Sequence, residues 1–321
     1  MRVLSTVSDA SKGPLPIGAS LRVLAARTKP LSSIYRALGA DGAKYIIKDM
    51  IKGEFDYQLQ LQRPLSSFPN VRSIVDTIKE REMFVYSFLA GDLLRLGQRP
   101  LSTETRRHTL RDALQGLVDL HALGVLHNDI KPNNILIDFD DGTDAQDPPS
   151  SVRIADLEDA VIVPPGKWLR GPLCGNALWR SPESWSRYSP ESSIRRVLFW
   201  YYGNTALRFL PFSPAQSTNS AQMIYAMVNE MVFRVPDSHL NAEDSWLHIL
   251  FRHISYFGDE EGVNGLLEHI GEANNPRQPL EAWRYLEPDL RDLIGKMTRL
   301  DPKNRITAKE ALDHPWFGDR V

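Results

Sequence analysis

The sequence predicts an α+β fold with two lobes, a small antiparallel β-rich N-terminal lobe and a larger helical C-terminal lobe. Short strand-like runs separated by turns fill the first part of the chain, and apolar residues at helical spacing fill most of the remainder. A length of 321 residues is enough for one two-lobed domain. Hydrophobic residues make up 42% of the chain, so we expect a packed core.

Composition divides the chain into unequal parts. Residues 1–19 are rich in Ser, Gly and Pro and are predicted to form a flexible leader. We assign residues 20–88 to the small lobe, residues 89–318 to the large lobe and residues 319–321 to a short tail. Within the large lobe, residues 193–219 crowd aromatic and arginine side chains without a regular period, and we regard them as an atypical, insert-like segment.

The small lobe is predicted from four short strands and one helix. Three of the strands are "LRVLAAR", "SIYRAL" and "KYIIKDM", and the turn Gly39–Gly42 separates the last two. The run "EFDYQLQLQ" is predicted to form a short helix that ends before Pro64, because proline lacks the N–H that a helix interior needs. The apolar run Met83–Leu89 is predicted to be a buried strand.

The large lobe carries several helix signals. Apolar residues between Leu110 and Leu120 recur at helical spacing, and Gly124 is placed to end that helix. A second helix is predicted over residues 290–297, and a capping box formed by Thr307 and Glu310 begins the last one. Two strand-like runs, "NILIDF" and "VRIADL", lie between the first and second of these helices.

Charge and cysteine content limit the kinds of partner. The net charge of −2 gives no electrostatic indication of binding to nucleic acid or to an anionic membrane. The longest apolar stretch, Val197–Tyr202, is too short to span a bilayer. The single cysteine, Cys174, allows no disulfide framework and fits a reducing compartment. We therefore expect a monomer inside the cell, in the cytoplasm or the nucleus.

The stretch "HNDIKPNNILI" holds the residue types that phosphoryl transfer from a nucleotide requires. Such transfer depends on positioning and on charge stabilisation. Asp129 can accept a proton from an alcohol, and Lys131 can reach the transferred phosphate. Asn134, five residues after Asp129 on a loop, can ligate Mg²⁺ through its amide oxygen, and Asp156 at the end of a strand adds a carboxylate.

These runs, taken in order, resemble the motifs of eukaryotic protein kinases. The catalytic loop His-Arg-Asp-x-Lys-Pro-x-Asn is similar to "HNDIKPNNIL", and "IADLE" stands where Asp-Phe-Gly is expected. Further matches are "GNALWRSPE" and "LDPKNRITAKEALDHPWF" downstream, and "YIIK" and the hinge-like "FVYSFLAGDLLRL" upstream. The resemblance covers roughly residues 20–318, and it is strongest to kinase-like proteins of fungi.

The resemblance implies an ATP-dependent serine/threonine kinase that uses Mg²⁺ and phosphorylates protein hydroxyls. By position in the motifs, Asp129 would be the catalytic base and Lys131 would neutralise charge on the transferred group. Asn134 and Asp156 would hold Mg²⁺. Lys48 would bind the α- and β-phosphates.

The resemblance also implies a nucleotide pocket and a supporting ion pair. Tyr86 would lie at the back of the adenine pocket, and the hinge from Ser87 to Leu89 would hydrogen-bond adenine. Glu183 would pair with Arg305 and tie the activation segment to the last helices.

Several positions depart from the family pattern. The loop "AARTKPLSSIYRA" has none of the expected phosphate-covering glycines. The helix position that should carry the glutamate partner of Lys48 falls near the neutral Gln58, and Glu54, one turn earlier, is a substitute. Glu158 adds a charge that could ligate a second Mg²⁺ or repel phosphates. Asn128 replaces an arginine, which suggests activity independent of activation-loop phosphorylation.

Three functions therefore stay open. The intact chemical residues favour a slow serine/threonine protein kinase. The missing glycines, the altered "DLE" run and the lack of any Asp between Glu183 and Asp237 to anchor the central helix favour a catalytically impaired pseudokinase that acts as an interaction module. A small-molecule kinase is the third possibility, but "WRSPE" and "LDPKNRIT" speak against it.

Overall fold

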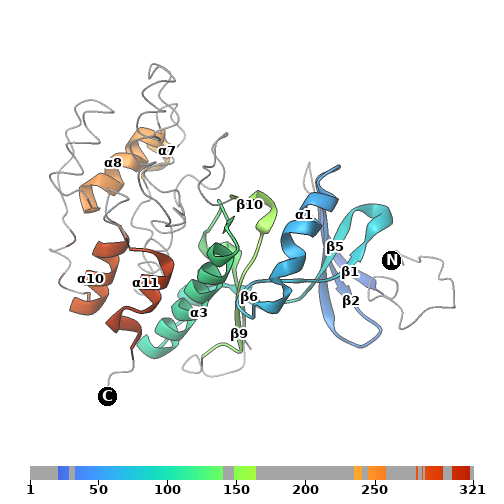
Figure 1. Ribbon diagram of the computed structural model, residues 1–321, viewed down its shortest axis with the longest axis horizontal. Helices are drawn as coiled ribbons and strands as arrows, with labels where there is room; N and C mark the ends of the chain where they lie inside the picture. Colours follow the sequence, from blue (N-terminus) through green and yellow to red (C-terminus); the bar gives the residue numbers. More distant parts are fainter. Residues whose placement is uncertain are drawn as a thin grey trace.

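A computed structural model describes most of the first half of the chain and parts of the second. The described residues are 21–28, 33–139, 148–163, 235–240, 245–257, 280, 284, 286–298 and 306–318. A strand-rich lobe lies at one end and a helical part at the other (Figure 1), so the predicted two-lobed α+β architecture is confirmed. The predicted leader, the insert-like segment 193–219, Glu183 and Arg305 lie outside the described residues.

The small lobe is built on one antiparallel sheet with the order β1-β2-β3-β5-β4. Its strands are β1 (Arg22–Thr28), β2 (Ser33–Leu38), β3 (Lys44–Asp49), β4 (Ile74–Ile78) and β5 (Met83–Ser87). The four predicted strands are confirmed, and β4 is an addition. The turn between β2 and β3 is also confirmed, because Gly39 N–H donates to the Ala43 carbonyl and Gly42 has a φ of 77°.

Helix α1 (Phe55–Gln62) covers this sheet and confirms the predicted helix. It continues as a 3-10 turn, η2 (Arg63–Ser67), in which Pro64 occupies one of the first two positions. Phe55 packs against Phe84 of β5 with ring centroids 4.9 Å apart. The buried face of α1 also carries two amides, Gln58 and Gln62, one turn apart.

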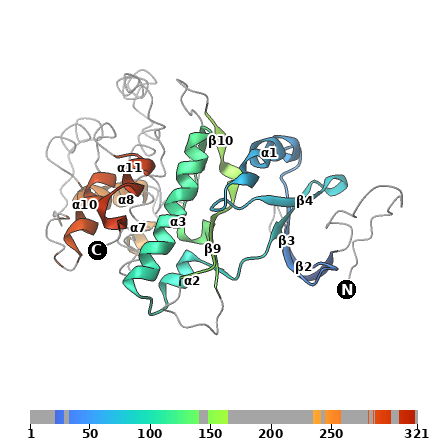
Figure 2. The same cartoon turned by 60° about the horizontal axis from the view of Figure 1, so that its bottom comes forward.

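Helix α3 (Thr103–Ala122) is the long helix of the large lobe, and it lies between the small sheet and the C-terminal helices in both views (Figures 1 and 2). The Ser102 side chain caps its first turn by accepting from Thr105 N–H. The chain leaves the helix through Gly124, whose φ of 69° is the left-handed conformation that glycine adopts without strain. The predicted helix and its end at Gly124 are therefore confirmed, and the Ser102 cap is an addition.

Short strands hold the segments "HNDIKPNNIL" and "IADLE". A three-stranded sheet has the order β6-β8-β9, and β7 pairs with β10. The strands are β6 (Gly91–Asp92), β7 (Val125–Leu126), β8 (Ile135–Asp138), β9 (Ser151–Ile154) and β10 (Val161–Ile162). The predicted runs "NILIDF" and "VRIADL" are thus confirmed as β8 and β9, and helix α2 (Leu93–Gly97) follows β6.

The C-terminal helices complete the large lobe. They are α7 (Asp237–Leu240), α8 (Ser245–Phe257), α10 (Pro288–Met297) and α11 (Ala308–Leu312), followed by the 3-10 turn η11 (Pro315–Phe317). The predicted capping box of α11 is present, because the Thr307 hydroxyl accepts from Glu310 N–H and the Glu310 carboxylate accepts from Thr307 N–H. Helices α7 and α8 were not predicted.

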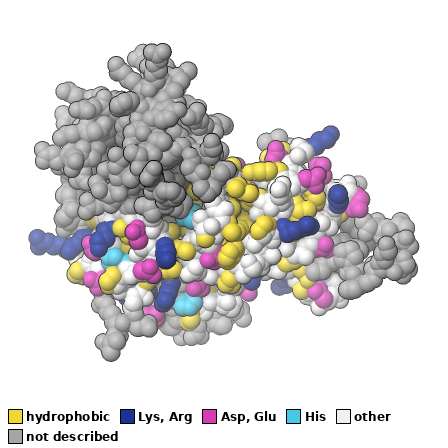
Figure 3. All heavy atoms as spheres, viewed as in Figure 1, with side chains coloured by type: hydrophobic (Ala, Val, Ile, Leu, Met, Phe, Trp, Pro, Cys, Tyr) yellow, Lys and Arg dark blue, Asp and Glu magenta, His cyan; other side chains and the backbone are white. Residues whose placement is uncertain are grey.

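The surface of the described residues mixes both signs of charge. On the face seen in Figure 3, Lys and Arg side chains alternate with Asp and Glu, in keeping with the small net charge of −2. None of the helices in the described ranges combines the length and the apolar character that crossing a bilayer would need.

Candidate active site

The motif "HNDIKPNNIL" folds as the connection between β7 and β8. It contains a 3-10 turn, η4 (Pro132–Asn134), which begins with a proline, a residue that does not fit a helix interior. Asp129 and Asn134 are both buried, with 8% and 5% of their surface exposed. A carboxylate this poorly hydrated needs fixed partners.

His127 anchors the beginning of this loop. Its ring is fully buried, with Nε2 2.8 Å from the Ala155 carbonyl, while Asp129 N–H donates to Nδ1 at 3.2 Å. These partners require a neutral ring with the proton on Nε2. Burial lowers the pKa of His127, in agreement with that state. The loop is thereby tied to the segment that leads into Asp156.

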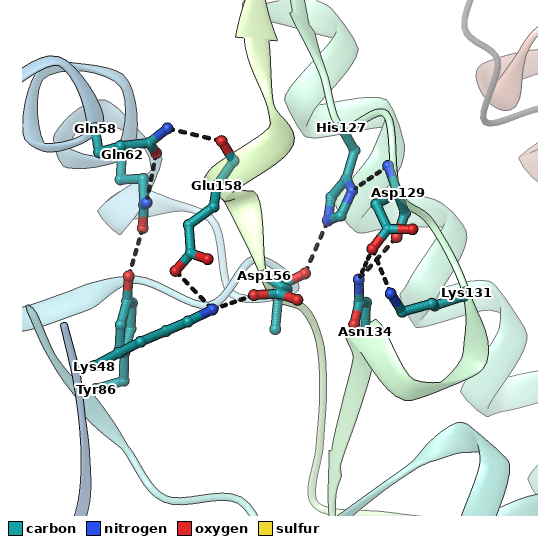
Figure 4. Close-up of polar contacts among 11 residues, drawn as sticks. Lys48, Gln58, Gln62, Tyr86, His127, Asp129, Lys131, Asn134, Asp156 and Glu158 are labelled. Atoms are coloured by element: carbon teal, nitrogen blue, oxygen red, sulfur yellow. Dashed lines mark hydrogen bonds and ion pairs between the residues drawn. The ribbon is translucent and has the colours of Figure 1, made fainter. Parts of the chain in front are cut away.

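Two side chains hold the Asp129 carboxylate. Asn134 Nδ2 donates to the Asp129 carbonyl at 2.8 Å and to Asp129 Oδ2 at 3.1 Å. Lys131 Nζ forms an ion pair with the same carboxylate oxygen (Figure 4). Ala155 N–H donates to the Asn134 carbonyl at 2.8 Å, which fixes the turn against the end of β9. Asp129, Lys131 and Asn134 therefore come together as the sequence analysis predicted.

Asp156 lies on the neighbouring segment, between β9 and the 3-10 turn η5 (Leu157–Asp159). Its φ of 66° is left-handed, a conformation that Asp adopts more readily than most residues. Its carboxylate forms an ion pair with Lys48 of β3 (Figure 4). Burial would raise the pKa of Asp156, but the charge and hydrogen bond of Lys48 outweigh it and hold that pKa below its ordinary value.

Lys48 has a second carboxylate partner, and it differs from the expected one. Its Nζ lies 2.6 Å from Glu158 Oε1. Glu54 is instead exposed at the start of α1, and Gln58 Nε2 donates to the Glu158 carbonyl at 2.9 Å. Among the described residues, the ion pairs of Lys48 are thus with Asp156 and Glu158, and the expected supply of a counter-charge from Glu54 is wrong. The reason is that the segment after Asp156 passes between α1 and Lys48 (Figure 4).

A chain of amides links this segment to the strand at the back of the site. Gln62 Nε2 donates to Gln58 Oε1 at 3.1 Å, and the Tyr86 hydroxyl donates to Gln62 Oε1 at 3.0 Å. Burial raises the pKa of Tyr86, so the phenol stays neutral and can donate. Sequence reasoning missed Gln62, although a second amide one turn after Gln58 on an apolar helix face was a usable signal.

Arg72 is another residue that sequence reasoning missed. Its guanidinium lies over the Tyr86 ring, 4.6 Å from the centroid, and its NH2 group donates to the Ser87 carbonyl at 3.0 Å. Its buried Nε has no hydrogen-bond partner among the described residues. Burial lowers the pKa of Arg72 to about 10, which leaves the group charged at neutral pH. One carbonyl of the predicted hinge is therefore already engaged, and Leu89 follows two residues later.

The structure also accounts for the residue that replaces the family arginine. Asn128 has a φ of 65°, and its Nδ2 donates to the Asp159 carbonyl at 2.9 Å. Asparagine suits this left-handed position because its short polar side chain can bond locally. Asn128 thus fastens the catalytic loop to η5.

The oxygen donors present fit Mg²⁺. Both donated bonds of the Asn134 side chain use its nitrogen, so its amide oxygen remains suited to a metal, and Asp156 adds a carboxylate. Among the described residues, no group of three or more His, Cys, Asp or Glu side chains is placed to hold a metal. Asn134 and Asp156 offer two oxygens, and Mg²⁺ commonly takes one or two protein oxygens and completes its shell with phosphate and water.

Comparisons with known proteins agree with this geometry. The family described as "Protein kinase domain" matches residues 43–317. The chain is 28% identical over 239 residues to mitogen-activated protein kinase HOG1 of Colletotrichum orbiculare. This match covers 73% of this chain and 57% of the relative. It is 31% identical over 246 residues to cell division control protein 2 homolog C of Antirrhinum majus. This match covers 73% of this chain and 70% of the relative.

A third relative is mitogen-activated protein kinase HOG1 of Saccharomyces cerevisiae, 28% identical over 237 residues, with 73% of this chain and 47% of the relative covered. The chain thus spans about half the length of the mitogen-activated relatives it matches. The family match includes both β3, which carries Lys48, and the catalytic loop. The chain therefore belongs to the protein kinase domain family.

Proposed function

We propose that this chain is an ATP-dependent serine/threonine protein kinase. The observation that carries the proposal is the position of the buried Asp129 carboxylate, which is held by Lys131 and Asn134 beside the ion pair of Lys48 with Asp156. Phosphoryl transfer needs a carboxylate at the acceptor hydroxyl, oxygen ligands for a divalent cation and cations for the phosphates. Two of the relatives are named mitogen-activated protein kinases, which supports a protein acceptor.

Asp129 is proposed to accept the proton of the acceptor hydroxyl. At the same time the hydroxyl oxygen bonds to the γ-phosphorus, and the bond from that phosphorus to ADP breaks. Asn134 and Lys131 both contact Asp129 Oδ2, which fixes the orientation of the carboxylate. Lys131 is also proposed to offset charge on the transferred group, and its presence in the loop favours Ser or Thr acceptors. A positioned general base of this kind contributes roughly 10²–10⁴-fold to the rate.

The opposite side of the site is proposed to bind the nucleotide. Lys48 would bind the α- and β-phosphates, and Asn134 and Asp156 would hold Mg²⁺, which neutralises phosphate charge when bound. Tyr86 would close the back of the adenine pocket, with hinge hydrogen bonds from Ser87 to Leu89. The pairing of Glu183 with Arg305 stays part of the proposal.

The partners and location are proposed more broadly. We propose a Ser- or Thr-containing protein substrate, a monomeric state, and a location in the cytoplasm or nucleus. Turnover is proposed to be slow, because two features compete with the nucleotide. Lys48 is paired with Asp156, and Arg72 donates to the Ser87 carbonyl of the hinge.

The same two features favour the second candidate, a pseudokinase that acts as an interaction module. A nucleotide must draw Lys48 away from at least one carboxylate before its phosphates are bound. If that exchange is too costly, the chain keeps the kinase fold without turnover. The two candidates differ in a single measurable step, the transfer of phosphate.

The test uses the purified full chain with Mg·ATP and a Ser/Thr-rich unfolded protein as acceptor. We expect ATP to raise the melting temperature and labelled γ-phosphate to enter the acceptor. The matched control is Asp129→Asn, which keeps the shape and the contact with Asn134 but cannot accept the proton. It should retain nucleotide binding and lose about 10²–10⁴-fold in transfer rate.

Each alternative has its own result. Nucleotide binding without transfer by the wild-type chain supports the pseudokinase. Transfer that is equal in the wild type and in Asp129→Asn indicates a contaminating kinase and removes the support for Asp129 as the base.

A further inference from the structure

We propose that Glu158 is the positioning residue for Lys48, taking the place of the helix carboxylate that α1 lacks, and that Gln58 holds Glu158 there. This inference rests on the proposed binding of nucleotide phosphates by Lys48. It assigns to Glu158 neither of the roles expected from the sequence, as a ligand of a second metal or as a source of repulsion.

The first argument is the contact itself. Lys48 Nζ lies 2.6 Å from Glu158 Oε1, and the two side chains are 12% and 27% exposed. An ammonium group that is mostly removed from water is held in one direction by an opposite charge at this distance. Glu158 is therefore placed to set the direction of the Lys48 side chain.

The second argument is the way Glu158 is held by helix α1. Gln58 is buried, with 3% of its surface exposed, and donates from Nε2 to the Glu158 carbonyl while its Oε1 accepts from Gln62. A carboxylate at position 58 could accept from Gln62 but could not donate to that carbonyl. It would also add a third negative charge next to Glu158 and Asp156. The amide and the relocated carboxylate thus form a matched pair.

The third argument is the division of work between the two carboxylates at Lys48. Asp156 is proposed to hold Mg²⁺ when nucleotide is bound. A carboxylate that ligates a metal forms a weaker ion pair with the Lys48 ammonium group. Glu158 lies in the turn η5 that follows directly, so it remains beside Lys48 when Asp156 turns to the metal. The short segment from Asp156 to Glu158 is then proposed both to position Lys48 for the phosphates and to supply the Asp156 carboxylate for the metal.

The test compares Glu158→Gln with Asp159→Asn, which removes a charge of the same sign one residue away. Asp159 shares η5, but among the described residues it forms no ion pair with Lys48. We measure the binding of ADP without metal, in excess chelator, and the KM and kcat for Mg·ATP. Thermal unfolding confirms that both variants fold.

We expect Glu158→Gln to weaken metal-free ADP binding about tenfold and to raise KM for Mg·ATP by a similar factor, with a smaller change in kcat. Asp159→Asn should stay within about twofold of the wild type in its affinity for metal-free ADP and in its KM for Mg·ATP. Unchanged or tighter ADP binding by Glu158→Gln would overturn the proposal. So would an equal loss in Asp159→Asn, or a defect of Glu158→Gln that appears only in the dependence on Mg²⁺, which would make Glu158 a metal ligand.

The binding measurement separates this inference from the proposed function. A wild-type chain that binds ADP but transfers no phosphate contradicts the kinase activity and still reports the role of Glu158. A wild-type chain that binds no ADP overturns both.

Discussion

The two sides of the active site reach their charge arrangement in different ways. On the catalytic-loop side, Asp129 meets Lys131 two residues away and Asn134 five residues away. On the other side, Lys48 meets Asp156 across 108 residues of chain. The loop keeps the family's charged and amide residues from Asp129 to Asn134, whereas the Lys48 side has lost its helix carboxylate.

The difference shows how tightly the spacing along the chain constrains each side. The loop is short and includes the turn that begins at Pro132, so few backbone arrangements bring a carboxylate, an ammonium group and an amide together. Each of these residue types must therefore stand at a particular spacing. Around Lys48, an opposite charge can come from any segment that passes within reach. The ion pair is preserved while the residue that supplies it has moved from α1 to η5.

The largest expected effect tests this division directly with two lysine variants. Lys131→Gln should lower kcat by about 10²-fold with little change in KM, because it removes charge stabilisation from the transfer step. Lys48→Gln should raise KM for Mg·ATP about tenfold, because it removes a ground-state contact with the phosphates. Steady-state kinetics with a protein acceptor measure both. If the two variants change the same parameter, the division between the two sides is wrong.

The next effect concerns the joint between the lobes and is measured as stability. A Cβ added at Gly116 of α3 would lie 2.4 Å from the Asn70 carbonyl, which accepts from Ile154 N–H. Backbone cannot yield as a flexible side chain does, so Gly116→Ala should cost about 1–3 kcal/mol in the free energy of unfolding. Urea unfolding measures this cost.

The matched control for Gly116 is the helical glycine Gly295 of α10. A Cβ there would first meet a Leu280 methyl group at 3.4 Å, which is close to ordinary contact. Gly295→Ala should be neutral, or stabilising by up to about 1 kcal/mol through helix propensity. A Gly116→Ala variant as stable as Gly295→Ala would contradict the tight packing of α3 against Asn70.

The smallest expected effect concerns the hinge. Arg72→Met keeps an apolar stem over Tyr86 but releases the Ser87 carbonyl. If adenine bonds this part of the hinge, ATP should bind about two- to tenfold more tightly, the range that corresponds to one hydrogen bond. Isothermal titration of ATP measures the change, with Arg111→Met on the exposed side of α3 as a control away from the hinge. Weaker binding by Arg72→Met would show that the guanidinium assists the nucleotide instead of competing with it.

Prediction from the sequence worked best where the signal was local. Helix α1, the capped helix α11 and the strands β3 and β5 were predicted from apolar spacing, turn residues and caps. Strand β4 was missed because it lies at an edge of the sheet as far as the described residues go, with β5 as its partner, and contains the polar pair Asp76 and Thr77. The pairing with β5 that makes this segment a strand forms only when the sheet folds.

The candidate site divides along the same line. Asp129, Lys131, Asn134 and Asp156 could be named from their residue types and their places on a loop and at a strand end, and Lys48 from the resemblance of "YIIK" to the family motif. The partner of Lys48 could not be named in this way. Glu54 and Gln58 were the candidates by spacing, and packing selected Glu158 because the chain after Asp156 passes between α1 and Lys48.

Reading the chain as a string was therefore sufficient for the two-lobed architecture, which follows from periodicity and caps. It was also sufficient for the family and its catalytic loop, which follow from the resemblance of the motifs to those of protein kinases. The counter-charge of Lys48, the amide chain from Gln58 to Tyr86 and the contact of Arg72 with Ser87 emerged only once the chain was folded. The physical reason is that an ion pair or a buried hydrogen bond depends on distance and desolvation in space, and residues far apart in sequence acquire these only through packing.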